Sequence, residues 1–200
     1  MALINCPYCG NRVSSLAPVC VYCGSDVSDS DEGLMYEIRN KTLIKYHGNR
    51  EVISIPGEIE IIGRGAFENC ESIVKVIIGN QVKNINDFAF SGCVSLESIS
   101  LPFIGATKDG TSNTHFGYIF GASSCYGNDD YVPASLKTVV ITGGTTIGEY
   151  AFSNLTTLTS VIIPEGVTSI EKGAFVHCHS LTEVSIPTTV TSIGASAFMY

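Results

Sequence analysis

Four cysteines near the start of the chain have the residue type and spacing of a metal site. They form two C-x2-C pairs, each followed by glycine, with ten residues between the pairs: Cys6, Cys9, Cys20 and Cys23. Each pair lets two thiolates converge on one ion, and four thiolates close a tetrahedron that leaves no position for water. The spacing therefore predicts one structural Zn²⁺, with two disulfides in a small secreted module as the competing interpretation.

These cysteines define a small module at residues 1–27, which an acidic linker at 28–33 follows. A module of this size cannot bury an adequate core, so zinc binding, worth about 10–16 kcal/mol, has to supply its folding free energy. The motifs CPYCG and CVYCG resemble those of the short N-terminal zinc ribbons of many bacterial proteins. Residues 1–33 hold one cation, Arg12, against four carboxylates, which favours a structural or protein-docking ribbon over phosphate binding. Nucleic-acid or regulatory binding through the ribbon is the alternative.

The whole chain is acidic, which argues against several classes of partner. Lys and Arg number 11 against 19 Asp and Glu, and the formal net charge is −8. Nonspecific binding to nucleic acid or to an anionic membrane needs the opposite balance. No segment has the apolar length of a membrane span, and the first residues lack the basic and apolar regions of a signal peptide. We expect a cytoplasmic protein with reduced cysteines, and a surface location is the alternative.

A 23-residue repeat fills most of the remaining sequence. Ala-Phe pairs recur at this interval, with one interruption: Ala66-Phe67, Ala89-Phe90, Ala151-Phe152, Ala174-Phe175 and Ala197-Phe198. In each repeat an L-x-x-I-x-I pattern places two apolar side chains on the same face of a strand. This periodicity predicts stacked repeats around one continuous core, and we place them at residues 50–200. Residues 34–49 fit a hairpin that caps the first repeat.

The repeat pattern, as in LTSVIIPEGVTSIEKGAFVHC, resembles the BspA-type leucine-rich repeat over roughly residues 50–200. The resemblance implies a mainly β fold, a leucine-rich-repeat solenoid of β-strand rungs with short helical turns, here preceded by the zinc ribbon. It implies a bacterial, non-enzymatic scaffold for protein–protein interaction. Surface-exposed members of the family are associated with adhesion, so an adhesin-like protein is a further alternative.

Two cysteine patterns within the repeats allow more than one interpretation. Cys70, Cys93 and Cys178 share one column, in which Leu155 stands in another repeat, so we expect small, buried, apolar side chains there. A disulfide between Cys70 and Cys93 is the alternative. The run His177-Cys178-His179 suggests a metal site, but Cys178 already belongs to the core column. We therefore expect the two histidines to be turn residues.

One repeat departs from the period and carries a candidate recognition loop. Leu101 and Ile141 are 40 residues apart, which is 17 more than one repeat, and residues 103–135 are rich in Gly, Ser, Thr and aromatic residues. HFGYIFGA stands where Ile-Gly-x-x-Ala-Phe is usual, so this segment is interpreted as a remodelled repeat. Its candidate partner residues are His115, Tyr118, Tyr126 and Tyr131, unless these aromatic side chains only pack the enlarged rung.

No organised catalytic motif accompanies the loop. Cys125 and His115 could serve as nucleophile and base of a hydrolase, but a third group to orient the histidine is missing from the pattern. The sequence also has no P-loop, G-x-S-x-G or H-E-x-x-H motif. We therefore predict that the protein is not an enzyme.

The outward positions of the strands form the larger candidate surface. They alternate with the inward apolar positions and are Lys75, Ile77, Ser98, Ser100, Thr138, Val140, Ser160, Ile162, Glu183 and Ser185. Such a face, with few charges, suits a protein or peptide partner. The chain stops within a repeat, at Phe198-Met199-Tyr200, so we expect the last rung to be frayed or covered by another chain.

Overall fold

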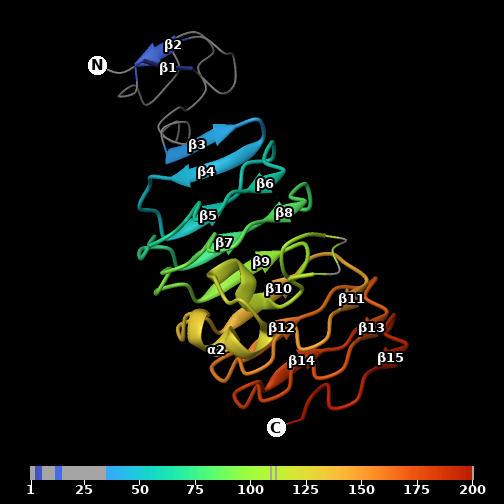
Figure 1. The fold of residues 1–200 in the computed structure, drawn as a ribbon. Coiled ribbons are helices and arrows are strands. Elements are labelled where there is room, and N and C mark those ends of the chain that lie inside the picture. Colours follow the sequence, from blue (N-terminus) through green and yellow to red (C-terminus); the bar gives the residue numbers. More distant parts are fainter. Residues whose placement is uncertain (1–2, 6–11, 15–34, 109, 111, 200) are drawn as a thin grey trace.

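The computed structural model of the chain describes residues 3–5, 12–14, 35–108, 110 and 112–199. Residues 35–199 wind into a solenoid, in which each turn, here called a rung, adds a strand to sheets that run along the axis (Figure 1). The Ala-Phe segments are turns between strands, and the remodelled repeat contains short helices within residues 116–131. The predicted mainly β solenoid is confirmed.

One side of the solenoid is a six-stranded parallel sheet. Its strands, in spatial order, are β5 (Val52–Ser54), β7 (Lys75–Ile77), β9 (Ser98–Leu101), β10 (Thr138–Ile141), β12 (Ser160–Ile162) and β14 (Glu183–Ser185). The central residue of each strand points into the core, as Val76 and Ile99 do, and its neighbours point outward. This alternation is the one that the L-x-x-I-x-I pattern predicts.

The opposite side carries shorter strands and is divided into two sheets. The first contains β3 (Tyr36–Arg39), β4 (Thr42–Tyr46), β6 (Ile61–Ile62) and β8 (Asn84–Ile85), and the second contains β11 (Thr146–Ile147), β13 (Ser169–Ile170) and β15 (Ser192–Ile193). β3 and β4 form an antiparallel hairpin whose turn residues, Asn40 and Lys41, have φ angles of 48° and 61°. β4 then pairs in parallel with β6, so the hairpin extends the short-strand side.

An aromatic ladder runs through the core and joins successive rungs. Phe67 stacks on Phe90 at a centroid distance of 5.0 Å, and Phe152 stacks on Phe175 at 5.1 Å. The backbone N–H groups of Phe67, Phe152 and Phe175 donate to the alanine carbonyl of the next rung, and that of Phe90 donates to the Ile119 carbonyl of the remodelled repeat. Small alanine side chains allow this close approach, and the rings fill the space between the two sheets.

The remodelled repeat inserts two phenylalanines where the other rungs have one. It contains the 3-10 helices η1 (Phe116–Phe120) and η2 (Cys125–Gly127) and the helical turn α2 (Asn128–Tyr131). Phe120 faces Phe90 of the preceding rung at 6.3 Å, and Phe116 faces Phe152 of the following rung at 5.2 Å. The two inserted rings lie 5.4 Å apart, so the ladder is continuous across the interruption.

The cysteine column is part of the core. Cys93 and Cys178 are buried, and their S–H groups donate to the carbonyls of Phe67 and Phe152, at 3.2 and 3.0 Å. Burial raises the pKa of both thiols to about 12, which makes them poor nucleophiles. Cys70 is half-buried and free of any disulfide, so the alternative Cys70–Cys93 bridge is absent.

Two short strands are described in the cysteine-rich module. β1 (Leu3–Asn5) and β2 (Arg12–Ser14) pair antiparallel, and Asn5 lies opposite Arg12. No helix within the described part of the chain is long and apolar enough to cross a membrane.

Candidate functional site

The outer face of the six-stranded sheet presents two parallel rows of side chains. Strand pairing aligns one row as Val52, Lys75, Ser98, Thr138, Ser160 and Glu183. It aligns the second row as Ser54, Ile77, Ser100, Val140, Ile162 and Ser185. All ten predicted strand positions therefore lie side by side on one surface, here called the row face.

Two members of the row face, Val52 and Ser54, are absent from the prediction. They belong to β5, where the sequence VISIP repeats the inward–outward alternation of the other strands. The signal was therefore present, since Ile55 precedes Pro56 in the same way as Leu101, Ile163 and Ile186 precede prolines. Both residues are exposed and extend the face by one strand.

The row face combines exposed aliphatic side chains with hydroxyl groups. The side chains of Ile162 and Val52 are 46% and 55% exposed, so neither of them is part of the core of the solenoid. Between them the rows hold Ser and Thr, and Lys75 and Glu183 are the charged members, near opposite ends. Isolated exposed aliphatic residues are ordinary on protein surfaces, whereas strand pairing aligns this set on one face.

The tyrosines of the remodelled repeat differ in their exposure. Tyr126 is 75% exposed and Tyr131 is also exposed, so both can contact a partner. Tyr118 is half-buried against the core. His115 is 7% exposed, and its Nε2 lies 3.0 Å from the carbonyl oxygen of Ala122, so it packs inside the repeat. Its predicted place on the partner surface is therefore wrong.

The hypothetical nucleophile–base pair is not assembled in the described residues. His115 contacts the Ala122 carbonyl and the edge of the Tyr118 ring, and no contact joins it to Cys125. Cys125 is half-buried, and its backbone carbonyl accepts a hydrogen bond from Ser153. The same segment is held by Asn128, whose side chain bonds to Gly117 and to Ser153. These contacts are those of a packed loop.

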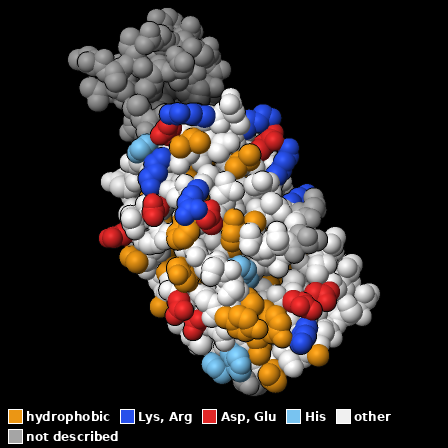
Figure 2. Space-filling view, in the orientation of Figure 1, with side chains coloured by type: hydrophobic (Ala, Val, Ile, Leu, Met, Phe, Trp, Pro, Cys, Tyr) orange, Lys and Arg blue, Asp and Glu red, His pale blue; other side chains and the backbone are white. Residues whose placement is uncertain are grey.

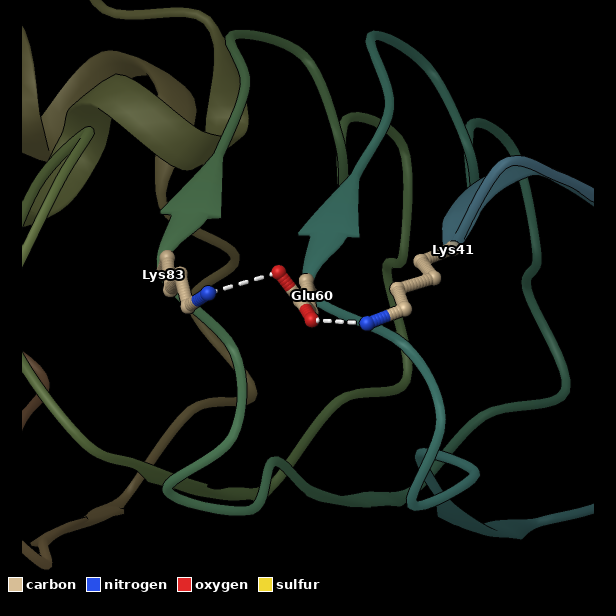
Figure 3. Close-up of polar contacts among 3 residues, drawn as sticks. All are labelled: Lys41, Glu60 and Lys83. Atoms are coloured by element: carbon tan, nitrogen blue, oxygen red, sulfur yellow. Dashed lines mark hydrogen bonds and ion pairs between the residues drawn. The ribbon is translucent and has the colours of Figure 1, made fainter.

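Charged side chains are unevenly distributed along the solenoid. In Figure 2, Lys and Arg gather over the N-terminal rungs, whereas the lower half of the same face carries a hydrophobic patch beside histidines. In the N-terminal rungs Glu60 accepts from Lys41 and Lys83, at 2.5 and 2.6 Å (Figure 3). Hydrogen bonds from the two ammonium groups lower the pKa of Glu60 from 4.5 to about 2. The Lys41–Glu60–Lys83 cluster lies outside the row face, whose charged members are Lys75 and Glu183.

The two cysteine-containing patterns considered as metal sites lie in different parts of the chain. Cys6, Cys9, Cys20 and Cys23 lie outside the residues that the structure describes, so the zinc prediction stays a prediction. His177 and His179 are exposed, with ring centroids 5.8 Å apart, and the Cys178 thiol between them points into the core. His177 has a φ of 60° in a column where Asn69, Gly92 and Asn154 also have positive φ, which identifies it as a turn residue.

Comparison with protein families gives a match over most of the chain. The BspA type leucine rich repeat region matches in six copies, over residues 37–112 and 128–200. No curated protein matches the chain significantly.

Solved structures of bacterial leucine-rich repeat proteins are similar to the chain. A leucine-rich repeat protein from Eubacterium ventriosum is 19% identical, with a TM-score of 0.50, over 80% of this chain and 46% of that one. A leucine rich cell surface protein from Faecalibacterium prausnitzii is 26% identical, with a TM-score of 0.44, over 82% and 49%. The T. pallidum leucine rich repeat protein is 21% identical, with a TM-score of 0.37, over 82% and 63%. The chain thus spans less than two thirds of each, and the E. ventriosum protein shows the shared fold.

Proposed function

Since this chain belongs to the BspA-type leucine-rich repeat family, we propose that it is a protein-interaction scaffold whose row face binds a protein partner. Its rigid stack of rungs holds outward side chains at a fixed spacing. A surface prepared in this way loses little conformational freedom when a partner binds. The fold itself requires only the inward residues, so the outward residues are free to serve recognition.

The observation that carries the proposal is the aligned aliphatic set on the row face. Ile77 and Ile162 are exposed, and Val140 lies between them, one strand away from Ile162. Hydroxyl groups of Ser100 and its neighbours surround these side chains and can pair with polar groups of a partner. Apolar contacts within a polar surround are typical of protein interfaces.

A paired substitution tests this surface. Ile162→Glu places a charge in the aligned set, whereas Val94→Glu places one at a similarly exposed aliphatic residue that lies outside the row face. Full-length protein is cross-linked in cell extract, and each cross-linked partner is identified and then bound again in purified form. We expect Ile162→Glu to weaken binding of the purified partner by at least about tenfold, since burying an unpaired charge is costly, and Val94→Glu to leave it unchanged. Equal binding by both variants would refute the proposal.

We further propose that residues 1–27 form a structural zinc ribbon. Four thiolates at Cys6, Cys9, Cys20 and Cys23 match the ligand set of a closed zinc site. In support, Asn5 and Arg12, which flank the first cysteine pair, lie opposite each other in the β1–β2 pairing. Zinc would supply the folding free energy that a core of this size lacks.

Nucleic-acid or regulatory binding through the ribbon has less support. Arg12 is the single Lys or Arg in residues 1–33, which also hold four carboxylates, all between residues 26 and 32. A phosphate backbone needs several cations, and four zinc-bound thiolates add further negative charge. The adhesin-like alternative uses the same row face and differs from the main proposal in the location of the protein.

A further inference from the structure

The remodelled repeat carries two exposed tyrosines on a segment that projects from the stack of rungs. This segment, here called the tyrosine lobe, consists of residues 125–131, which form η2 and α2 (Figure 1). The side chains of Tyr126 and Tyr131 are 75% and 48% exposed, whereas the other described tyrosines are buried or half-buried. The same repeat buries Phe116 and Phe120 in the core. The repeat therefore divides its aromatic side chains between the core and the surface.

The two exposed rings belong to one patch. Tyr126 is followed directly by Gly127, and a Cβ at Gly127 would lie 3.7 Å from the Tyr131 ring. The Tyr131 ring therefore lies beside bare backbone, one residue away from Tyr126. Asp129 and Asp130, which stand between the two tyrosines in the chain, are also exposed. The lobe thus presents two aromatic rings and two carboxylates within one short segment.

Hydrogen bonds fix the backbone of the lobe to the rest of the solenoid. The side chain of Asn128 accepts from the Gly117 N–H and donates to the Ser153 carbonyl. The Ser153 hydroxyl in turn donates to the Cys125 carbonyl at 2.9 Å. A tyrosine side chain on a fixed backbone has only two χ angles to order, so little conformational entropy is lost when a partner covers it. The lobe is therefore prepared for contact before a partner arrives.

The charge of the lobe selects the sign of the charge on its partner. Between residues 110 and 136 the sequence has two carboxylates, Asp129 and Asp130, and no Lys or Arg. Neither carboxylate forms an ion pair with a described residue. The nearest cation along the chain, Lys137, donates to two backbone carbonyls instead. The faces of tyrosine rings also carry negative potential and attract cations, so rings and carboxylates favour the same kind of partner.

We propose that the tyrosine lobe binds a basic segment of a protein partner. An Arg or Lys side chain of that segment stacks on the ring of Tyr126 or Tyr131. A neighbouring cationic side chain pairs with Asp129 or Asp130. Arg suits both contacts, because its planar guanidinium stacks on aromatic faces and donates two N–H groups to one carboxylate.

A protein fits the lobe better than the other large partners do. Tyr and Arg are among the residues that dominate the energetics of protein interfaces. Nucleic acids and anionic membranes present negative charge, which the two carboxylates of the lobe repel. This inference goes beyond the proposed function, since it uses a surface other than the row face and specifies the charge of the partner.

The proposal is tested with random peptides displayed on phage, which are selected on the immobilised full-length chain and resynthesised for affinity measurement. We expect the selected peptides to be enriched in Arg and Lys. Their affinity should fall by roughly tenfold in Tyr126→Ala, which removes a ring, and stay the same in Tyr126→Phe, which keeps the ring and loses only the hydroxyl.

A second pair of variants tests the carboxylates. The double variant Asp129→Asn with Asp130→Asn should also lose roughly tenfold in affinity, because it removes the ion-pair partners of the basic segment. Its matched control is Glu58→Gln with Glu165→Gln, which removes the same charge from exposed positions in other rungs and should leave the affinity unchanged. Melting temperatures equal to that of the unsubstituted protein confirm that each variant folds.

Other outcomes would overturn the proposal. If both double variants weaken binding equally, the peptides respond to the net charge of the chain and the lobe is not their site. Peptides whose binding is lost in Ile162→Glu but kept in Tyr126→Ala would support the row face and exclude the lobe. Selected peptides without basic residues, or failure to select any peptide, would also contradict the lobe, while cross-linked partners that depend on Ile162 would still support the row face.

Discussion

Individual residues divide between those that hold the fold and those that the fold leaves free. Cys93 and Cys178 appear chemically distinctive in the sequence, but their thiols are buried, bonded to carbonyls and shifted to a pKa of about 12. Ile162, an ordinary residue in the sequence, is exposed in an aligned row. The core therefore suppresses the reactivity of these thiols, and the proposed recognition surface consists of unreactive side chains.

The first prediction concerns zinc. The full-length chain is expected to contain one zinc per molecule, and Cys9→Ser to lose it, because three thiolates and a hydroxyl bind zinc much more weakly than four thiolates. Metal content by mass spectrometry after gel filtration measures this. Cys125→Ser is the matched control and should keep the zinc. Full zinc content in Cys9→Ser would contradict the four-cysteine site.

Glu60 gives a prediction about pH. The pKa of Glu60 is about 2 in the folded chain, compared with 4.5 for a glutamate without ion-pair partners. The ion pairs of Glu60 therefore stabilise the fold fully above pH 4.5, and this contribution is lost as the pH falls toward 2. Glu60→Gln is therefore expected to be less stable than the unsubstituted chain at pH 6 and equal to it near pH 2. Urea unfolding across this pH range measures the difference. Glu58→Gln, an exposed neighbour, should show no such dependence. If the difference in stability between Glu60→Gln and the unsubstituted chain does not change with pH, the ion pairs of Glu60 are not its cause.

Whole elements follow the sequence period more closely than their details do. The strand positions could be predicted from the alternation of apolar and polar residues, and the Ala-Phe turns and the cysteine column from the 23-residue period. A second column of positive φ, at Gly65, Phe88, Tyr150, Gly173 and Ser196, could not. Its residue types have nothing in common, and aromatic residues at φ of 51–58° oppose the usual preference for glycine. This conformation is imposed by the packing of neighbouring rungs.

That column gives a prediction about glycine. Gly173 has a φ of 60°, and a Cβ at this position would overlap the ring of Tyr150 in the preceding rung. Gly173→Ala is therefore expected to lower the free energy of unfolding by about 1–3 kcal/mol, through backbone strain and overpacking. Gly57→Ala is the control, since no atom lies within 4 Å of a Cβ there, and it should be neutral. Chemical denaturation measures both, and equal stability of the two variants would contradict this packing.

The remodelled repeat depends on one buried amide. Asn128 is fully buried, its Oδ1 accepts from the Gly117 N–H at 2.9 Å, and its Nδ2 donates to the Ser153 carbonyl at 3.0 Å. Asn128→Ala leaves both groups unpaired and should cost about 2–4 kcal/mol. Hydrogen exchange should also accelerate at the Gly117 amide. Asp129→Ala, at the exposed neighbour, is expected to be neutral. Unchanged protection of Gly117 in Asn128→Ala would show that the loop is held by other contacts.

At the scale of the molecule, the inserted segment joins two blocks of regular repeats. Its position, its extra length and its place as a remodelled repeat could be predicted from the sequence. The division of the short strands into two sheets could not, because it depends on how the inserted residues fold in space. Phe116 and Phe120 continue the aromatic ladder through the core, whereas the described short strands fall into two sheets, one ending at β8 and the other at β11. One insertion thus keeps the core continuous and interrupts a sheet.

The continuous ladder predicts how the solenoid unfolds. In a stack of repeats each rung is stabilised chiefly by its neighbours, so cooperativity depends on the weakest junction. Phe120, which is nearly fully buried, contacts Phe90 on one side and Phe116 on the other. Phe120→Ala should lower stability by about 3–5 kcal/mol and separate unfolding into two transitions, one for each block.

Urea titration followed by hydrogen exchange, read separately over residues 35–101 and 136–199, measures this separation. The control is Phe198→Ala, which removes a ring at the C-terminal end of the described ladder, where Phe175 is the one described ring that it stacks on, at 5.2 Å. This variant should lose less stability and keep a single transition for the remaining rungs, because it breaks no junction between the blocks. If Phe120→Ala still unfolds in one transition over both ranges, the blocks must be coupled through the six-stranded sheet, where β9 and β10 pair over four residues. The two results therefore distinguish whether the ring ladder or the sheet makes the solenoid one cooperative unit.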